Sequence, residues 1–259
     1  MDRRSFIKTT VLGGLATGFT GFIEKEKTHI LTLSFDDGFK RSFYKTAYIY
    51  EQYGLKACFN VIASGHLPDF KQPDPYILPS QMGNFDDWNA LKKRGHEVMM
   101  HTWDHTNLTQ LPFDQATSLI DKCISYFKEH LEGFDATQSV YNFAFNASTP
   151  ELEKYALSKV RAVRTDGNMI NPIPKSKQPV RLGCGSNGPA NIDKYVEEQV
   201  NKFLASSGGG WLMLNTHGLD DEGWGPMSSS YLSELLQRLK KIDYLEMLST
   251  GVVMKRIIP

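Results

Sequence analysis

The chain has 259 residues, and its 29 Lys+Arg balance 29 Asp+Glu, so the formal charge is zero at pH 7. This balance argues against nucleic acid or an anionic membrane surface as the main partner. Hydrophobic residues make up 41% and charged residues 22% of the chain, which excludes a disordered or collagen-like protein and leaves enough apolar material for one large domain.

The first 23 residues predict a targeting segment rather than part of the fold. Arg3 and Arg4 are followed, after Lys8, by an uncharged, glycine-rich run that is too short to span a bilayer comfortably. Residues 1–23 therefore resemble a twin-arginine export signal, and a frayed amphipathic N-terminus is the alternative. We expect an exported protein of the periplasm or cell envelope, with no stable membrane insertion beyond an uncleaved signal. Residues 24–259 are then expected to form one domain.

Short, β-prone apolar runs alternate with helix-like stretches along the rest of the chain. The clearest helices are predicted over residues 113–130 and 228–241, each with one apolar face. Such alternation indicates an α/β fold with a mainly parallel sheet that either closes into a barrel or stays open and doubly wound. The strands are predicted over residues 29–35, 57–63, 97–100, 139–145, 162–165, 211–216 and 244–248.

Two stretches rich in proline and glycine, residues 68–79 and 172–189, predict long surface loops, which in α/β folds often meet the substrate. Cys58, Cys123 and Cys184 are too widely spaced for a metal knuckle. They are expected to be small buried hydrophobes, although in an exported protein one pair could bridge and leave one thiol over.

The first polar motif is Asp36-Asp37-Gly38, which directly follows the apolar run 29–35. Adjacent side chains on an extended backbone point in different directions, so the two carboxylates can serve different purposes. An ordinary turn, in which an aspartate accepts backbone hydrogen bonds before the glycine, explains the same residues equally well.

The second motif contains His101 and His105, which follow the apolar run 97–100. Histidines four residues apart can reach a single metal ion, although exposed histidines without a ligand are the more common explanation of such a pair. Asp37 favours the metal-site explanation, because two imidazoles and one carboxylate complete a three-ligand site with open positions for water and substrate.

The third motif is His217, at the end of the apolar run 211–216. A histidine satisfied by a backbone carbonyl in the core is one explanation. A general acid that faces the metal site from across the sheet is the other.

Together these motifs resemble the polysaccharide deacetylase family, the NodB-type carbohydrate esterases, over about residues 32–254. The Asp-Asp-Gly motif of the family matches residues 36–38, and its His-Ser/Thr-x-x-His motif matches His101, Thr102 and His105. Its Leu-x-x-His motif matches Leu214 and His217. The resemblance implies a distorted (β/α) barrel of mainly parallel strands, and metal-dependent removal of acetyl groups, chiefly N-acetyl groups, from an acetylated saccharide.

Carried over by position, Asp37, His101 and His105 would hold a divalent metal, for which we expect Zn²⁺. Asp36 would be the general base and His217 the general acid. Thr102 would brace the loop between the two histidine ligands.

The chain departs from the family after the predicted strand 139–145, where many members carry an arginine that orients the base. Residues 142–147 contain no arginine. Arg164, at the end of the predicted strand 162–165, is the natural replacement, because a guanidinium can hold a carboxylate with two hydrogen bonds. The alternative is a surface arginine that covers a helix. The backbone N–H near Ala147 is a candidate for binding the oxyanion.

Trp224, in the glycine-rich loop after His217, is expected either to stack on a sugar or to pin its own loop, and Trp103 is expected to pack. Two other functions fit the same residues. A degenerate relative would bind metal and sugar without turnover, which the altered residues 142–147 favour. A non-haem iron oxygenase would use the same two histidines and carboxylate, but it would leave Asp36 without a task.

Overall fold

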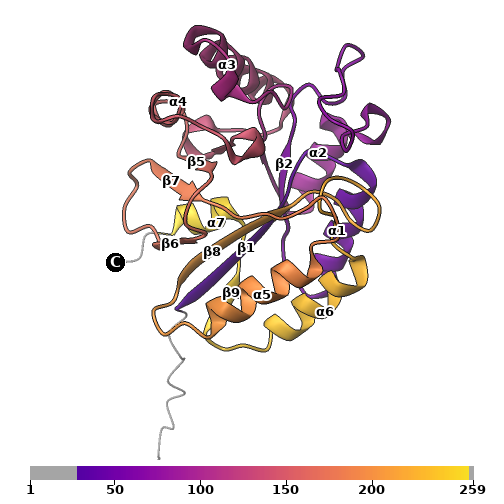
Figure 1. Ribbon diagram of the computed structural model, residues 1–259, viewed down its shortest axis with the longest axis vertical. Coiled ribbons are helices and arrows are strands. Elements are labelled where there is room, and N and C mark those ends of the chain that lie inside the picture. The colour runs from indigo at the N-terminus through magenta and orange to yellow at the C-terminus, as the bar shows by residue number, and fades with distance from the viewer. Residues whose placement is uncertain (1–27, 257–259) are drawn as a thin grey trace, which may run out of the picture.

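The structure is a computed structural model that describes residues 28–256 (Figure 1). The predicted export signal, residues 1–23, lies outside these described residues. The strands are β1 (His29–Phe35), β2 (Cys58–Val61), β3 (Glu97–Met100), β4 (Val140–Asn142), β5 (Ala162–Thr165), β6 (Ile170–Asn171), β7 (Val180–Gly183), β8 (Gly210–Thr216) and β9 (Leu245–Met247). The α-helices are α1 (Lys40–Gln52), α2 (Phe85–Lys93), α3 (Phe113–His130), α4 (Pro150–Leu157), α5 (Asp193–Leu204), α6 (Ser229–Leu239) and α7 (Thr250–Lys255). Short 3₁₀ turns lie at Pro79–Gln81, Leu108–Gln110, Ala136–Gln138 and Ala144–Asn146.

The strands form one sheet in the order β6-β8-β1-β2-β3-β4-β5-β7, and β9 pairs with β1 in addition. All pairs are parallel except β6 with β8. The chain after β7 returns to β8, where the N–H of Gly185 donates to Met213 O at 3.3 Å and that of Asn215 donates to Gly185 O at 3.0 Å. The sheet is therefore a nearly closed barrel, as predicted, rather than an open doubly wound sheet.

The barrel is irregular at β1. Residues at the start of β1 pair with β9, from His29 to Leu31, whereas Ser34 and Phe35 at its end pair with β2. On its other side β1 pairs with β8 along its whole length. This change of neighbour distorts the barrel, because one side of a single strand serves two different partners.

Every residue of β1 is buried, as expected for a parallel strand covered on both faces. Side chains alternate between the two faces: Leu31, Leu33 and Phe35 belong to the larger hydrophobic cluster, which the surrounding helices cover, while Ile30 belongs to a second, smaller cluster. The smaller cluster also contains Trp211 of β8, and we assign it to the barrel interior.

The structure differs from the sequence-based prediction in several element boundaries, of which three are the largest. The strand predicted over residues 139–145 ends at Asn142, because Phe145 and Asn146 have positive φ angles of 58° and 49° and turn the chain. The stretch 172–189, predicted as one loop, contains the strand β7. The predicted helix 228–241 is shorter at both ends, as α6.

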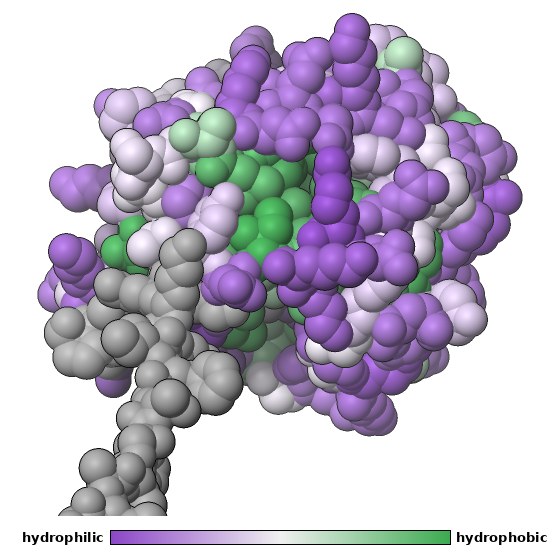
Figure 2. All heavy atoms as spheres, turned by 90° about the horizontal axis from the view of Figure 1, so that it is seen from below, coloured by the Kyte–Doolittle hydropathy of each residue, from purple (hydrophilic) through white to green (hydrophobic). Residues whose placement is uncertain are grey.

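Hydrophilic side chains cover most of the face seen from below, and hydrophobic ones gather near its centre (Figure 2). Among the helices between residues 28 and 256, none is both long and apolar enough to cross a membrane. All three cysteines are buried and free, as expected for small core residues.

Candidate active site

A layer of polar residues lies at the carboxyl ends of the barrel strands, and the period-2 alternation of the strands explains it. In β1, Ile30 faces the smaller, inner cluster. Ser34 lies four residues later and Asp36 six residues later, so both belong to the same face as Ile30. The same alternation places Arg164 two residues after Ala162 in β5, and Asn215 two residues after Met213 in β8. Apolar residues thus fill the early part of the interior, and polar residues occupy the end where α/β barrels form their sites.

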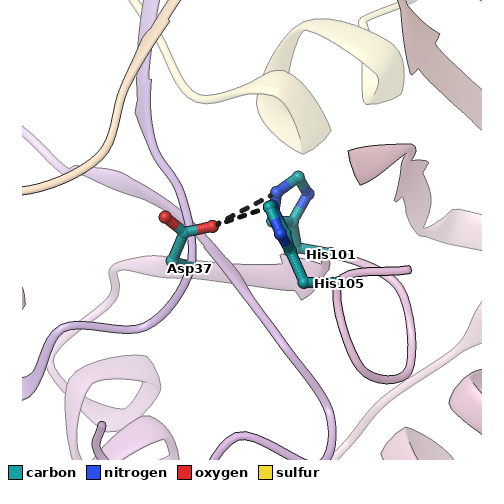
Figure 3. Close-up of side chains that lie close together, drawn as sticks. All are labelled: Asp37, His101 and His105. Atoms are coloured by element: carbon teal, nitrogen blue, oxygen red, sulfur yellow. Dashed lines mark ion pairs between the residues drawn. The ribbon is translucent and has the colours of Figure 1, made fainter. Parts of the chain in front are cut away.

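Asp37, His101 and His105 come together as the sequence predicts, with one possible ligand atom from each within 4.8 Å of the others (Figure 3). Asp37 Oδ1 lies 3.5 Å from His101 Nε2 and 3.4 Å from His105 Nε2. Two atoms that bind one tetrahedral zinc at about 2.0–2.1 Å stand about 3.3 Å apart. These two distances therefore fit a shared divalent cation.

The two imidazoles present their Nε2 atoms to this site. His101 Nδ1 lies 3.1 Å from the carbonyl oxygen of Asn142, so Nδ1 carries a proton and Nε2 is the ring atom that faces Asp37. For His105, burial lowers the pKa to about 4, so its ring is neutral at pH 7, the form that binds metals. Thr102 Oγ1 accepts a hydrogen bond from the N–H of His105 at 3.1 Å, which is the bracing contact expected from the sequence.

Backbone strain is concentrated around these residues. Six non-glycine residues between 28 and 256 have a positive φ, and they include Asp37 at 77°, Thr102 at 64° and His105 at 62°. Each such conformation costs about 1–3 kcal/mol and persists only where the surrounding structure holds it. The strain is therefore stored where the candidate ligands are positioned.

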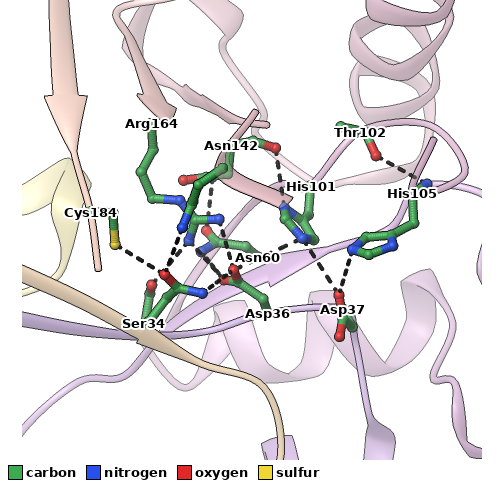
Figure 4. Close-up of polar contacts among 12 residues, drawn as sticks. Ser34, Asp36, Asp37, Asn60, His101, Thr102, His105, Asn142, Arg164 and Cys184 are labelled. Carbon is green, nitrogen blue, oxygen red and sulfur yellow. Dashed lines mark hydrogen bonds and ion pairs between the residues drawn. The ribbon is translucent and has the colours of Figure 1, made fainter. Parts of the chain in front are cut away.

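Asp36 is held from several sides, and its Oδ2 lies 3.9 Å from His101 Nε2, although Asp36 is not one of the three candidate ligands (Figure 4). Arg164 donates to both carboxylate oxygens of Asp36, at 2.9 and 2.7 Å, so it takes the place that the sequence assigned to it. Asn60 donates to Asp36 Oδ1 at 2.7 Å, and Asn215 donates to Oδ2 at 3.1 Å. A carboxylate offers about four lone-pair sites, so these four hydrogen bonds saturate Asp36.

The opposite charges of Asp36 and Arg164 keep both side chains ionised although both are buried. Burial alone would raise the pKa of Asp36, but the positive charge of Arg164 and its hydrogen bonds hold that pKa well below its usual range. Burial would likewise lower the pKa of Arg164, and the charge of Asp36 raises it instead. The base predicted from the sequence is thus a fixed, ionised and weakly basic carboxylate.

A cavity of about 310 Å³ opens above the polar layer. It is lined by Asp36, Asp37, Asp74, Tyr76, Ile77, His101, His105, Phe145, Asn146, Arg164, Ser186, Asn215, His217 and Trp224. Both proline-rich loops contribute to it, as their position in an α/β fold suggested. Of the eight buried side-chain polar atoms without a hydrogen-bond partner among residues 28–256, five belong to cavity-lining residues, which is the pattern of a ligand site.

His217 and Trp224 lie on the wall of this cavity. Their rings meet edge to face at 5.5 Å between centroids. The ring of Trp224 also packs on Gly188, where any Cβ atom would lie 2.5 Å from it. Trp224 therefore pins the loop in which it lies and still borders the cavity. Trp103 packs outside the cavity, against Tyr126 and beneath the ammonium of Lys122 at 3.9 Å.

The sequence suggested a backbone N–H near Ala147 for oxyanion binding. The N–H of Ala147 itself donates to the carbonyl of Ala144 at 3.0 Å and is already satisfied. The chain makes a 3₁₀ turn at this point, which directs that N–H back into the turn.

Three asparagines of the site were not predicted from the sequence. Asn60 and Asn215 bind Asp36, and Asn142 donates to Asn60 Oδ1 at 3.0 Å while its carbonyl accepts from His101. Each is an amide near the carboxyl end of an otherwise apolar strand. That signal was present in the sequence, because an amide in a buried strand needs hydrogen-bond partners.

A profile of the family described as polysaccharide deacetylase matches residues 24–156. No curated protein matches the chain. Among solved structures, a putative polysaccharide deacetylase from Mycobacterium smegmatis is similar, with 13% identity, a TM-score of 0.63, and coverage of 89% of this chain and 90% of that one.

Two further solved structures resemble the chain in fold. Peptidoglycan deacetylase PdaC from Bacillus subtilis has 15% identity and a TM-score of 0.53, with 87% of this chain and 90% of that one covered. A mutant of a CE4 family pseudoenzyme with restored enzymatic activity has 11% identity and a TM-score of 0.56, with 90% of this chain and 69% of that one covered. At these identities the likeness concerns the fold alone.

Proposed function

Because the chain belongs to the polysaccharide deacetylase family, we propose that it hydrolyses acetyl groups, chiefly N-acetyl groups, from a carbohydrate or cell-envelope polysaccharide. The observation that carries the proposal is one cavity lined by a three-ligand cluster, by the fixed carboxylate of Asp36 and by the imidazole of His217. These are the parts that hydrolysis of an amide requires: a cation site, a proton acceptor and a proton donor.

The proposed cofactor is a divalent cation, with Zn²⁺ as our expectation, held by Asp37, His101 and His105. When bound, such a cation polarises a carbonyl and lowers the pKa of water to about 7. Asp37 Oδ1 supports this assignment, because it is buried and has no hydrogen-bond partner among the described residues. A buried carboxylate oxygen of this kind requires a proton donor or a cation.

Asp36 is proposed as the general base. Its carboxylate is ionised and lies beside the ligand cluster, with Oδ2 3.9 Å from His101 Nε2. Arg164 is proposed as its positioning residue, since two hydrogen bonds fix the carboxylate plane. Because the pKa of Asp36 is lowered, it is a weak base, and a bound cation that made water more acidic would favour proton transfer to it.

His217 is proposed as the general acid. It follows β8, and Trp224 holds its ring from the side. A proton delivered to the leaving nitrogen converts a poor leaving group into a neutral amine, and a positioned acid of this kind contributes about 10²–10⁴-fold to the rate. The acid and the base then reach the substrate from different strands of the barrel.

The substrate is proposed to be an acetylated saccharide, with neither nucleic acid nor membrane as a partner. Tyr76, Phe145 and Trp224 line the cavity, and aromatic rings on a cavity wall can cover the faces of sugars. Phe145 remains 55% exposed although it lies beside His105, with 4.6 Å between ring centroids. Export by residues 1–23, to the periplasm or cell envelope, is proposed on the sequence of that segment.

A second candidate function is binding of metal and sugar without turnover. Saturation of Asp36 by four hydrogen bonds favours it, because a proton transferred to Asp36 must displace one of these donors. The resemblance to a CE4 family pseudoenzyme structure is compatible with this candidate, though it concerns the fold alone.

Acetate release separates the two candidates. The full chain is loaded with Zn²⁺ and assayed on N-acetylglucosamine oligomers, peptidoglycan and acetylated xylan, with and without a chelator. The deacetylase proposal predicts release that the chelator abolishes and that added Zn²⁺ restores. Stoichiometric zinc binding without release from any of these substrates would favour the binding function.

A further inference from the structure

We propose that Glu222 is a positioning residue, which holds the loop 218–227 against the first turn of α1 and thereby sets the place of His217, the proposed general acid. The inference rests on the proposed deacetylase function and extends it to a residue outside the cavity lining. It is carried by a buried group of hydrogen bonds at the start of α1.

Helix α1 lacks a cap of its own. Phe39 occupies the N-cap position and makes no side-chain hydrogen bond there, and the first turn contains no acidic residue. The first N–H groups of a helix have no partner within the helix, and the helix dipole favours an anion beside them. Ser42 lies in this first turn and is buried, so its N–H needs an acceptor from another part of the chain.

Glu222 supplies this acceptor from the loop after β8. Its Oε2 accepts one hydrogen bond from the N–H of Ser42 at 3.0 Å and another from Ser42 Oγ. Its Oε1 accepts a hydrogen bond from Arg41 Nε at 3.1 Å. Glu222 is only 3% exposed, and both of its carboxylate oxygens are used. The carboxylate is thus the cap that the sequence of α1 does not provide.

Ser42 holds a second point of the same loop. Its hydroxyl donates to Glu222, and Ser42 Oγ in turn accepts a hydrogen bond from the N–H of Leu219 at 2.9 Å. One side chain of α1 therefore binds both residues 219 and 222. The two acids between them form ion pairs at the surface, where such pairs add little to stability. The buried contacts of Glu222 therefore hold the loop more firmly than its neighbours do.

The loop folds back directly onto His217. Gly223 follows Glu222 with φ 83°, and a Cβ atom at this position would lie 3.0 Å from His217 Cβ. Trp224 comes next, and its ring meets the His217 ring edge to face at 5.5 Å between centroids. The two residues after Glu222 thus both pack on His217, so a displacement of Glu222 shifts the surroundings of the imidazole.

The consequence for the reaction depends on the leaving group. An amine leaves only after it has received a proton, so a displaced general acid slows hydrolysis of an amide. The 4-nitrophenolate ion is stable without a proton, so hydrolysis of 4-nitrophenyl acetate does not need that acid. Damage to the metal site or to the base slows both reactions. The ratio of the two rates therefore reports the position of His217 separately from the rest of the site.

The experiment measures kcat/KM for acetate release from N-acetylglucosamine oligomers and from 4-nitrophenyl acetate, with the zinc-loaded, full-length chain. Glu222→Gln keeps the size of the side chain but replaces one acceptor oxygen by an NH₂ group, which faces a donor in either orientation. We expect this variant to lower the amide-to-ester ratio by at least about 10-fold, because displacement of a site by 1 Å can cost about 10²-fold. Ser42→Ala should lower the ratio in the same direction, with zinc content unchanged in both variants.

Two control variants separate positioning from a general loss of stability, which is followed by the urea midpoint. Asp221→Asn removes only the surface ion pair with Arg41 and should leave the ratio within about twofold of wild type. Glu51→Gln acts at the other end of α1, where the carboxylate binds Arg94 and His96. It should lower the urea midpoint and leave the ratio unchanged.

Three results would overturn the proposal. An unchanged ratio in Glu222→Gln, or in Ser42→Ala if the first variant does not fold, would mean that the acid keeps its place without these contacts. An equal fall of the ratio in Glu51→Gln would mean that the ratio follows the stability of α1. Wild type that cleaves the amide but not the more reactive ester would contradict the dependence on the leaving group. Absence of acetate release from the oligomers by zinc-loaded wild type would instead refute the deacetylase function and the inference with it.

Discussion

Replacement of Arg164 by methionine tests the most strongly coupled contact in the site. The substitution removes the two hydrogen bonds to Asp36 and the one to Ser34 Oγ at 3.3 Å, and it leaves a fully buried carboxylate without a countercharge. Loss of one partner of a buried ion pair typically costs about 3–5 kcal/mol. Against a total stability of about 5–15 kcal/mol, Arg164→Met should lower the urea midpoint markedly.

The pH dependence of this loss follows from the pKa of Asp36. In wild type this pKa lies below its unfolded value of about 3.9, so the carboxylate adds stability above pH 3.9 that is lost as pH falls through the folded pKa. In Arg164→Met the guanidinium no longer opposes the effect of burial, which raises the pKa of Asp36. The ionised carboxylate then destabilises the folded state at pH 7. The deficit relative to wild type should therefore shrink as the pH is lowered from 7 toward 4.

The assay is urea unfolding followed by circular dichroism, in chelator, so that metal affinity does not contribute. The control is the double variant Asp36→Asn/Arg164→Met, which removes both charges and should regain at least half of the lost stability. A loss below about 1 kcal/mol in Arg164→Met, or a double variant no more stable than the single one, would refute the coupling of these residues.

Three other substitutions test separate parts of the site. Asp36→Asn should abolish acetate release while bound zinc, measured by atomic absorption, stays equimolar; activity that persists would exclude Asp36 as the base. His105→Ala should lower zinc affinity by at least 10-fold in a competition assay with a chelating dye, and an unchanged affinity would contradict the ligand assignment. Asp74 Oδ2 lies 3.8 Å from His105 Nδ1, which has no other partner among the described residues. Asp74→Asn should therefore weaken zinc binding by up to about 10-fold. Tighter zinc binding in this variant would be inconsistent with that contact.

Much of the site was predictable because its residues sit in contiguous motifs. Asp36 and Asp37 follow one apolar run, and His101 and His105 follow another. The carboxyl ends of parallel strands meet at one end of a barrel, so residues far apart in sequence had to converge there. Arg164 was predicted because the resemblance implies an arginine that orients the base, and Arg164 lies near the end of a strand whose carboxyl end meets the same site.

The amide network was harder to predict because it depends on register. Asn60, Asn142 and Asn215 matter only through the face on which each side chain lies, and a shift of one residue would turn each away from the interior. The turn at Phe145 and Asn146 depends on positive φ angles that no local pattern in the sequence announces. These angles both shorten β4 and direct the N–H of Ala147 toward the carbonyl of Ala144.

Metal stoichiometry together with chelator-sensitive acetate release tests the central claim most directly. The full-length chain and its His101→Ala variant are purified, loaded with Zn²⁺, and assayed on N-acetylglucosamine oligomers. We predict one zinc per wild-type chain, with acetate release that a chelator abolishes and zinc restores, and loss of both properties in the variant. Acetate release that persists in the chelator-treated, metal-free protein would contradict the account, because no step assigned to Asp36 or His217 proceeds without the cation.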